Sequence, residues 1–303
     1  METIYIGIDG GGTRTRVGIA LGDGTLLERR EAKSSNIYAV GEESAKDHVR
    51  SLLDEALASY EGYPIGGCCF ASAGLGRPSE KQMWSAFFDG YFNGQVNTLL
   101  TSDGLALLAG TLPQPVGLCL ISGTGSICIG RNEVGTIVRS GGFGAILGDE
   151  GSAWWIAREA IRGSLLAAEG RGCPTILGQA ITGQLKLTAL ENLIGWANDK
   201  ERTKAQIASL APAVTDAAEG GDELATRILD GAVSHLIELV EATEARLPPS
   251  WPHHLGLGGG VLEKDRYIQS RLTERLSPRW TLFEGHDAAL KGAIALAVEN
   301  NRR

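Results

Sequence analysis

Two glycine-rich loops are the clearest candidates for chemistry in this 303-residue sequence. The first (residues 9–13) reads Asp-Gly-Gly-Gly-Thr, and the second (residues 122–126) reads Ser-Gly-Thr-Gly-Ser. Glycines let successive backbone N–H groups face one concavity, an anion nest that suits a phosphate group. In the first loop, Asp9 is placed to hold Mg²⁺ through water. An ordinary glycine hairpin is the alternative for either loop taken alone.

The two loops repeat at one offset. Gly10 and Gly123 are 113 positions apart, as are Gly12 and Gly125. Each loop lies between two apolar, strand-like segments, so the repeat indicates two halves of similar topology that could clamp a polyphosphate. Neither a GxxxxGK[ST] loop nor a GxGxxG that opens a helix is present. A third glycine cluster (residues 256–260) follows a predicted strand, where the backbone can approach a flat ring closely.

Three polar residues near strand or helix ends are candidate substrate contacts. Asp103 follows a predicted strand and either caps the next helix or accepts a proton from a substrate hydroxyl. Asp149 lies in a Gly-Asp-Glu-Gly loop, where it or Glu150 alternatively caps a helix. Asn36 ends a strand and suits turn chemistry. The five histidines show no metal-ligand spacing.

The composition excludes several classes of protein. With 42 glycines but only 10 prolines and 43% hydrophobic residues, the chain is neither collagen-like nor disordered. A formal net charge of -8 argues against nucleic acid or an anionic membrane as partner. The sequence predicts no membrane span and no secretory signal, and therefore a cytoplasmic location. Its five cysteines form no CxxC motif and are expected to be buried thiols.

Strands that alternate with helices predict an α/β protein. Strands are expected at residues 4–8, 16–20, 66–72, 96–101, 117–121, 127–130, 254–257 and 280–283, with a further one directly after the turn at residues 23–24. Helices are expected at residues 41–60, 79–90, 151–168, 222–247 and 286–300, with several more between 178 and 219, one that opens after residue 103 and one between residues 260 and 280. Two prolines place a domain boundary near residues 112–116.

In this order, the first loop, Asp103, the second loop and residues 258–260 resemble the phosphate-1, connecting, phosphate-2 and adenosine segments of the actin/hexokinase/heat-shock-70 ATPases. More closely, the sequence resembles the BadF/BadG/BcrA/BcrD-type ATPase family and, within it, the N-acetylglucosamine kinases. The motifs are IGIDGGGTRT (6–15), SSN (34–36), TSDG (101–104), ISGTGS (121–126) and GGFGAILGDEGSAWW (141–155). They span nearly the whole chain, and their combination is specific where no single motif is.

The resemblance implies two ribonuclease-H-like domains, residues 1–113 plus 287–303 and residues 114–286, with an active-site cleft between them. It also implies ATP and Mg²⁺ as cofactors, phosphorylation of the 6-hydroxyl of an amino sugar, and Asp103 as the base. The residues implied to hold or line the sugar are Asn36, Ser126, Ile127, Gly142, Phe143, Gly144 and Asp149. Those implied to border ATP are Gly11, Gly12, Thr13, Gly123, Thr124, Gly125, Ala218, Gly259 and Gly260.

The sequence also departs from the family's pattern. Ile37 and Tyr38 follow Asn36 where the animal enzyme has a tryptophan, and Phe143 replaces another tryptophan. Glucosamine therefore stays open as the substrate instead of N-acetylglucosamine. Two other classes are alternatives: an activator that couples ATP hydrolysis to electron transfer through an iron–sulfur cluster, with Cys119 and Cys128 as candidates, and a nucleotide-dependent sugar sensor. A homodimer is compatible with the resemblance.

Overall fold

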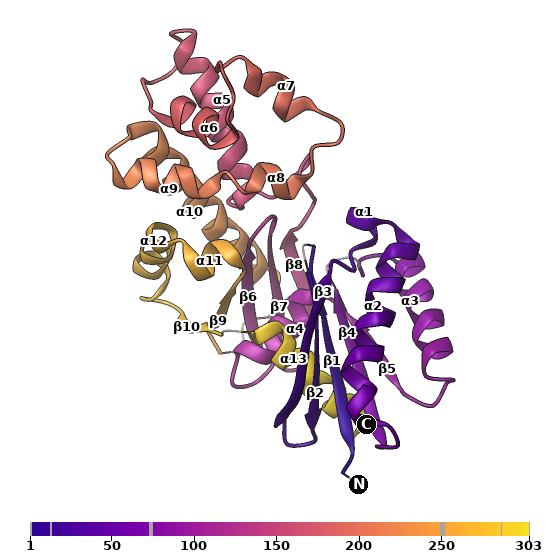
Figure 1. The fold of residues 1–303 in the computed structure, drawn as a ribbon. Helices are drawn as coiled ribbons and strands as arrows, with labels where there is room; N and C mark the ends of the chain where they lie inside the picture. The colour runs from indigo at the N-terminus through magenta and orange to yellow at the C-terminus, as the bar shows by residue number, and fades with distance from the viewer. Residues whose placement is uncertain (1, 13, 73–74, 249–251, 286, 303) are drawn as a thin grey trace. The chain divides into compact units, whose positions relative to one another are not determined.

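The computed structural model describes residues 2–12, 14–72, 75–248, 252–285 and 287–302. The chain forms two compact units, Met1–Cys119 with Phe283–Arg303 and Leu120–Leu282. The protein contains two five-stranded sheets (Figure 1). The α/β class predicted from the sequence is therefore confirmed. In the described ranges, no helix combines the length and the apolar character needed to cross a membrane.

The sheet of the first unit has the order β3-β2-β1-β4-β5. Its strands are β1 (Ile4–Gly10), β2 (Arg14–Leu21), β3 (Leu26–Lys33), β4 (Ile65–Ser72) and β5 (Thr98–Thr101). β4 runs parallel to both β1 and β5, and its Ala71 pairs with Asp9 on one side and Thr101 on the other. Since parallel strands end at a common edge, Asp9 and the residues that follow β5 lie at the same edge of the sheet.

Both faces of this sheet are covered. Its helices are α1 (Ile37–Val40), α2 (Glu42–Leu57), α3 (Pro78–Tyr91), α4 (Asp103–Thr111) and α13 (Ala288–Asn301), with a short 3-10 turn η1 (Ala58–Tyr60) after α2 (Figure 1). Side chains of β4 alternate between two apolar clusters, as the period of a strand requires. Cys68 and Phe70 join the cluster with α2 and α3, where the ring of Phe70 lies 4.5 Å from that of Trp84. Cys69 and Ala71 face small residues of α4 and α13.

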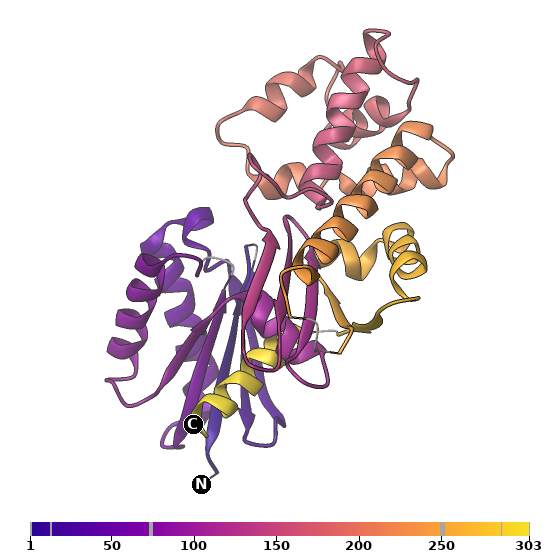
Figure 2. The ribbon, with the colours of Figure 1, turned by 180° about the vertical axis from the view of Figure 1, so that it is seen from behind.

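The sheet of the second unit has the order β10-β9-β6-β7-β8. Its strands are β6 (Gly117–Ser122), β7 (Ser126–Arg131), β8 (Ile137–Gly141), β9 (His254–Gly258) and β10 (Thr281–Glu284). Its helices are α5 (Ala153–Ala168), α6 (Leu177–Leu185), α7 (Asn192–Asn198), α8 (Lys204–Ala208), α9 (Ala211–Glu219), α10 (Glu223–Glu244), α11 (Gly260–Lys264) and α12 (Arg266–Leu276) (Figure 2). The apolar stripe predicted for α10 is buried, including Leu229, Val233, Leu236 and Val240.

Two elements were not among the predicted ones. α1 has only four residues, too few to show a helical period, and β8 follows the turn that the sequence marks at Gly135. The helical segment 178–219 is divided into separate short helices. Its first member, α6, ends at Lys186, whose left-handed backbone (φ 54°) cannot continue a right-handed helix.

Candidate active site

Asp103 lies at the start of α4, directly after β5. Ser102 caps this helix, because its side-chain oxygen accepts a hydrogen bond from Leu105 N at 3.2 Å. The alternative that Asp103 is the helix cap is therefore wrong. Asp103 Oδ1 accepts one hydrogen bond from Gly104 N at 2.9 Å.

The surroundings of Asp103 suit a general base. Burial raises the pKa of Asp103 to about 6, and the negative charge of Asp9 adds to the increase while the Gly104 N–H opposes it. Such a carboxyl is ionised at neutral pH and still binds a proton more strongly than a solvated aspartate does. These are the properties that a base needs when it takes a proton from a hydroxyl near pH 7.

Asp9 also lies at this edge, and its carboxylate forms an ion pair with Arg16. It pairs with Arg16 across the β1–β2 ladder, and Arg16 Nε donates to Asp9 Oδ2 at 3.0 Å. Burial raises the pKa of Asp9, while the positive charge of Arg16 opposes that rise. Arg16 also forms an ion pair with Asp287 in the loop before α13, so it is held from two sides.

The residues at this edge fit Mg²⁺ bound mainly by a nucleotide. Among the described residues, no three or more His, Cys, Asp or Glu side chains are grouped to hold a metal. Mg²⁺ usually keeps several waters and needs only one or two protein carboxylates in addition to substrate phosphates. The Arg16 bonds engage Asp9 Oδ2, so Oδ1 is the oxygen available to a metal-bound water.

The first glycine loop is tied to the turn at Asn36. Gly11 O accepts a hydrogen bond from Ser34 Oγ at 3.0 Å, and the same hydroxyl accepts one from Asn36 N at 3.0 Å. Asn36 caps α1, because its Oδ1 accepts from Tyr38 N at 2.9 Å. The local role expected for Asn36 is thus confirmed, while its contact with a sugar stays a prediction. Thr13 lies outside the described residues.

The second glycine loop is fastened to the segment before α5. Ser122 Oγ donates to Gly151 O at 2.9 Å, and Ser126 Oγ donates to Glu150 O at 2.7 Å. The amide of Gly123 donates to Gly125 O at 2.9 Å within the loop. The two serine hydroxyls of this loop thus bind protein carbonyls and hold the loop in position.

Space explains one glycine in each loop, Gly10 and Gly125, whereas a Cβ on Gly12 would meet nothing within 4 Å. None of the described loop glycines has a left-handed φ. Binding of phosphate by the two loops stays a prediction. A Cβ on Gly125 would lie 2.7 Å from Asp149 Oδ1 and 2.8 Å from Lys204 Nζ. Any side chain there would displace these two groups.

Asp149 lies beside the second loop in a left-handed backbone conformation. Its φ is 65°, which is uncommon outside glycine. Its Oδ1 accepts a hydrogen bond from Ser126 N at 3.1 Å, and its Oδ2 forms an ion pair with Lys204. Ser152 caps α5, so the cap alternatives for Asp149 and Glu150 are wrong. Sequence reasoning missed Lys204 as the partner of Asp149, because it lies 55 positions away on a helix without a recognisable motif.

Other residues predicted to line the sugar pocket lie close to the second loop. Gly142 N donates to Ser126 O at 3.0 Å, and a Cβ on Gly142 would lie 2.7 Å from the side chain of Ile127. The side chain of Phe143 is 63% exposed, and Gly144 follows with φ 84°. A mainly exposed phenyl ring has surface available for contact with a ligand.

The third glycine cluster packs on the second loop. Gly259 has φ 92°, and a Cβ there would lie 2.5 Å from Ser122 O. Gly260 N is 3.6 Å from the position of a Cβ on Gly123. Ala218 is a buried residue of α9, and its place near a nucleotide stays a prediction.

The cysteines do not support the iron–sulfur alternative. Cys119 and Cys128 have no exposed surface, and burial raises the pKa of Cys128 to about 12. A bridging cluster needs thiolates presented at a surface where a second copy of the chain meets them. The two thiols are instead part of the protein interior.

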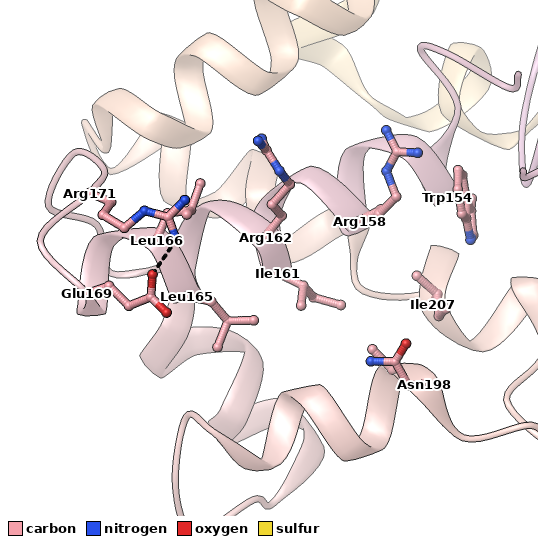
Figure 3. A pocket seen from close by; sticks show the side chains of 11 residues that line it. Trp154, Arg158, Ile161, Arg162, Leu165, Leu166, Glu169, Arg171, Asn198 and Ile207 are labelled. Carbon is pink, nitrogen blue, oxygen red and sulfur yellow. Dashed lines mark hydrogen bonds and ion pairs between the residues drawn. The ribbon is translucent and has the colours of Figure 1, made fainter. Parts of the chain in front are cut away.

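A cavity of about 470 Å³ along α5 is separate from these residues (Figure 3). None of the predicted site residues lines it. Its arginines have acidic partners: Arg171 NH1 lies 2.6 Å from Glu169, and Arg158 NH2 lies 2.7 Å from Glu159. We therefore assign no chemistry to this cavity.

Several known proteins are similar to this chain over nearly its whole length. The Dictyostelium discoideum N-acetyl-D-glucosamine kinase is 31% identical over 91% of this chain and 90% of its own length. The N-acetylmuramic acid/N-acetylglucosamine kinase of Clostridium acetobutylicum is 34% identical over 96% of this chain and 97% of its own length. A Chromobacterium violaceum structure, provisionally named an N-acetylglucosamine kinase, has a TM-score of 0.76 with 26% identity and covers 97% of this chain and 99% of that one.

The model of one family matches residues 6–295, which include every site residue discussed above. The chain therefore belongs to the BadF/BadG/BcrA/BcrD ATPase family.

Proposed function

We propose that this protein is an ATP-dependent kinase that transfers the γ-phosphate of ATP to the 6-hydroxyl of N-acetylglucosamine. The observation that carries the proposal is Asp103, a partly buried carboxyl whose pKa is raised to about 6 at the sheet edge that also holds Asp9. The use of ATP comes with the family. Two relatives that are at least 31% identical over nine tenths of the chain are N-acetylglucosamine kinases by name.

In this proposal, Asp103 orients the 6-hydroxyl and accepts its proton as the oxygen attacks the γ-phosphorus. Phosphoryl transfer passes through a loose transition state, so positioning and charge neutralisation provide most of the rate increase. Asp9 would hold Mg²⁺ through water, and the ion would neutralise charge on the phosphate oxygens. Arg16 keeps the Asp9 side chain in one orientation.

The second loop would supply donors to ATP and contacts to the sugar. Among the hydrogen bonds of the described residues, the amides of Gly123 and Ser126 are engaged, while those of Thr124 and Gly125 are not. We assign these two amides to phosphate oxygens. Asp149 retains unused lone pairs on both carboxylate oxygens, which suits a sugar hydroxyl once the Lys204 side chain shifts.

A coupled assay of ADP release tests the proposal. With Mg·ATP, we expect turnover on N-acetylglucosamine and measure glucosamine, N-acetylmannosamine, N-acetylmuramic acid and glucose in parallel. Preference for glucosamine would keep the mechanism and change the substrate. Silence on every sugar would contradict the kinase assignment.

The raised pKa of Asp103 predicts the acid side of the pH profile. Only the ionised carboxyl accepts a proton, so kcat/KM should be constant above about pH 7 and fall about tenfold per pH unit below about pH 6. The measurement is kcat/KM for the sugar between pH 5 and 9 in buffers of constant ionic strength. The residual activity of Asp103→Asn, which has no such group, should lack this decline. A wild-type midpoint near pH 4 would show that Asp103 is not the titrating base.

A further inference from the structure

Lys204 is the solvent-facing member of its ion pair. The side chain of Asp149 is 4% exposed, whereas that of Lys204 is 33% exposed. The ammonium lies beside the second loop, since a Cβ on Gly125 would be 2.8 Å from its Nζ. Beside the second loop, the second unit therefore exposes the Lys204 ammonium to a ligand, while the Asp149 carboxylate that neutralises it is buried.

The position of this cation is well defined. Lys204 is the first residue of α8, and a capping box between Thr203 and Gln206 holds that end of the helix. This cap fixes the backbone from which the Lys204 side chain reaches the second loop. The neighbouring Arg202 is engaged elsewhere, since it stacks over Trp196 and approaches Asp199.

We propose that Lys204 is a specificity-determining residue that makes the sugar site prefer hexoses with an uncharged 2-substituent, such as an N-acetylamino group, over the 2-ammonium of glucosamine. The inference rests on the proposed function. Asp149, the carboxylate that contacts the second loop, offers no free negative charge to an ammonium ion, because Lys204 already neutralises it. At a few ångströms and in a partly solvated environment, repulsion between two like charges changes binding by about a factor of ten or more.

Repulsion between Lys204 and a charged 2-substituent predicts how substitutions change sugar preference. Lys204→Met leaves the Asp149 charge uncompensated, so kcat/KM for glucosamine relative to N-acetylglucosamine should rise about tenfold. Lys204→Arg keeps the charge and should keep the wild-type ratio. Lys200→Met removes an exposed lysine without an ion pair in the described structure, and it controls for the change in net charge. If Lys204 has a purely structural role, Lys204→Met should lower kcat/KM for both sugars and leave the ratio of the two values unchanged.

A second measurement needs only the wild-type protein, in case Lys204→Met does not fold. Glucose and glucosamine both lack the acetyl group and differ in charge at position 2. As competitive inhibitors of N-acetylglucosamine phosphorylation, glucose should have a Ki at least tenfold lower than glucosamine. A lower Ki for glucosamine, or a Lys204→Met ratio within twofold of wild type, would overturn the role of Lys204. Absence of wild-type turnover on any sugar would instead refute the proposed function.

Discussion

Asp103→Asn is expected to lower kcat at least 100-fold while the protein stays folded. General base catalysis contributes about 10²–10⁴-fold, and an amide cannot accept the proton that the carboxylate accepts. The amide oxygen can still accept the hydrogen bond from Gly104 N, and Ser102 continues to cap α4. The KM values for ATP and sugar should therefore change much less than kcat.

Stability provides an independent test of the same residue. Because the folded-state pKa of Asp103 is raised, the group contributes stability when it is protonated, and this contribution is lost as the pH rises through about 6. At pH 8, the free energy of unfolding of Asp103→Asn should therefore exceed that of wild type by up to about 3 kcal/mol, which denaturant unfolding measures. Near pH 4, the two free energies should differ little. Near-normal turnover by the folded variant would show that Asp103 is not the general base. A variant less stable than wild type at pH 8 would show that burial of the Asp103 charge does not destabilise the protein.

Much of the fold could be predicted because local patterns and long-range packing agree. β4 is a continuous apolar run, as expected for a strand buried on both faces, and the apolar stripe on α10 matches the helical period. α1 and β8 are short and gain their order from the Asn36 cap and from pairing with β7, which no local period reveals.

Parts of the candidate site could be predicted where one short motif contains both the strand or helix end and the polar side chain beside it. Asp103 and the second loop are of this kind. The choice between Asp103 and Ser102 as helix cap could not be made from the sequence, since the two are adjacent and both suit the role. Lys204 reaches Asp149 only through the folding of α5 to α8, so its part in the site could be seen only in three dimensions.

Gly292→Ala is expected to destabilise the protein by about 3 kcal/mol or more. α4 and α13 cross at Gly110 and Gly292, where each glycine lies against the backbone of the other helix. A Cβ on Gly292 would overlap Ala106 O and lie 2.6 Å from Gly110 N. The obstacle is backbone on both sides, so no side chain can rotate to make room.

Gly90→Ala is the matched control, since it adds the same methyl group to a helix of the same unit. A Cβ on Gly90 would have no neighbour within 4 Å, and alanine favours helices, so we expect unchanged or slightly higher stability. The Gly292 variant should also lose activity, because α13 supports α4, which carries Asp103 at its first position. Urea unfolding of the two variants measures the difference. Equal midpoints would mean that the two helices can separate at little cost, and that the position of Asp103 does not depend on this contact.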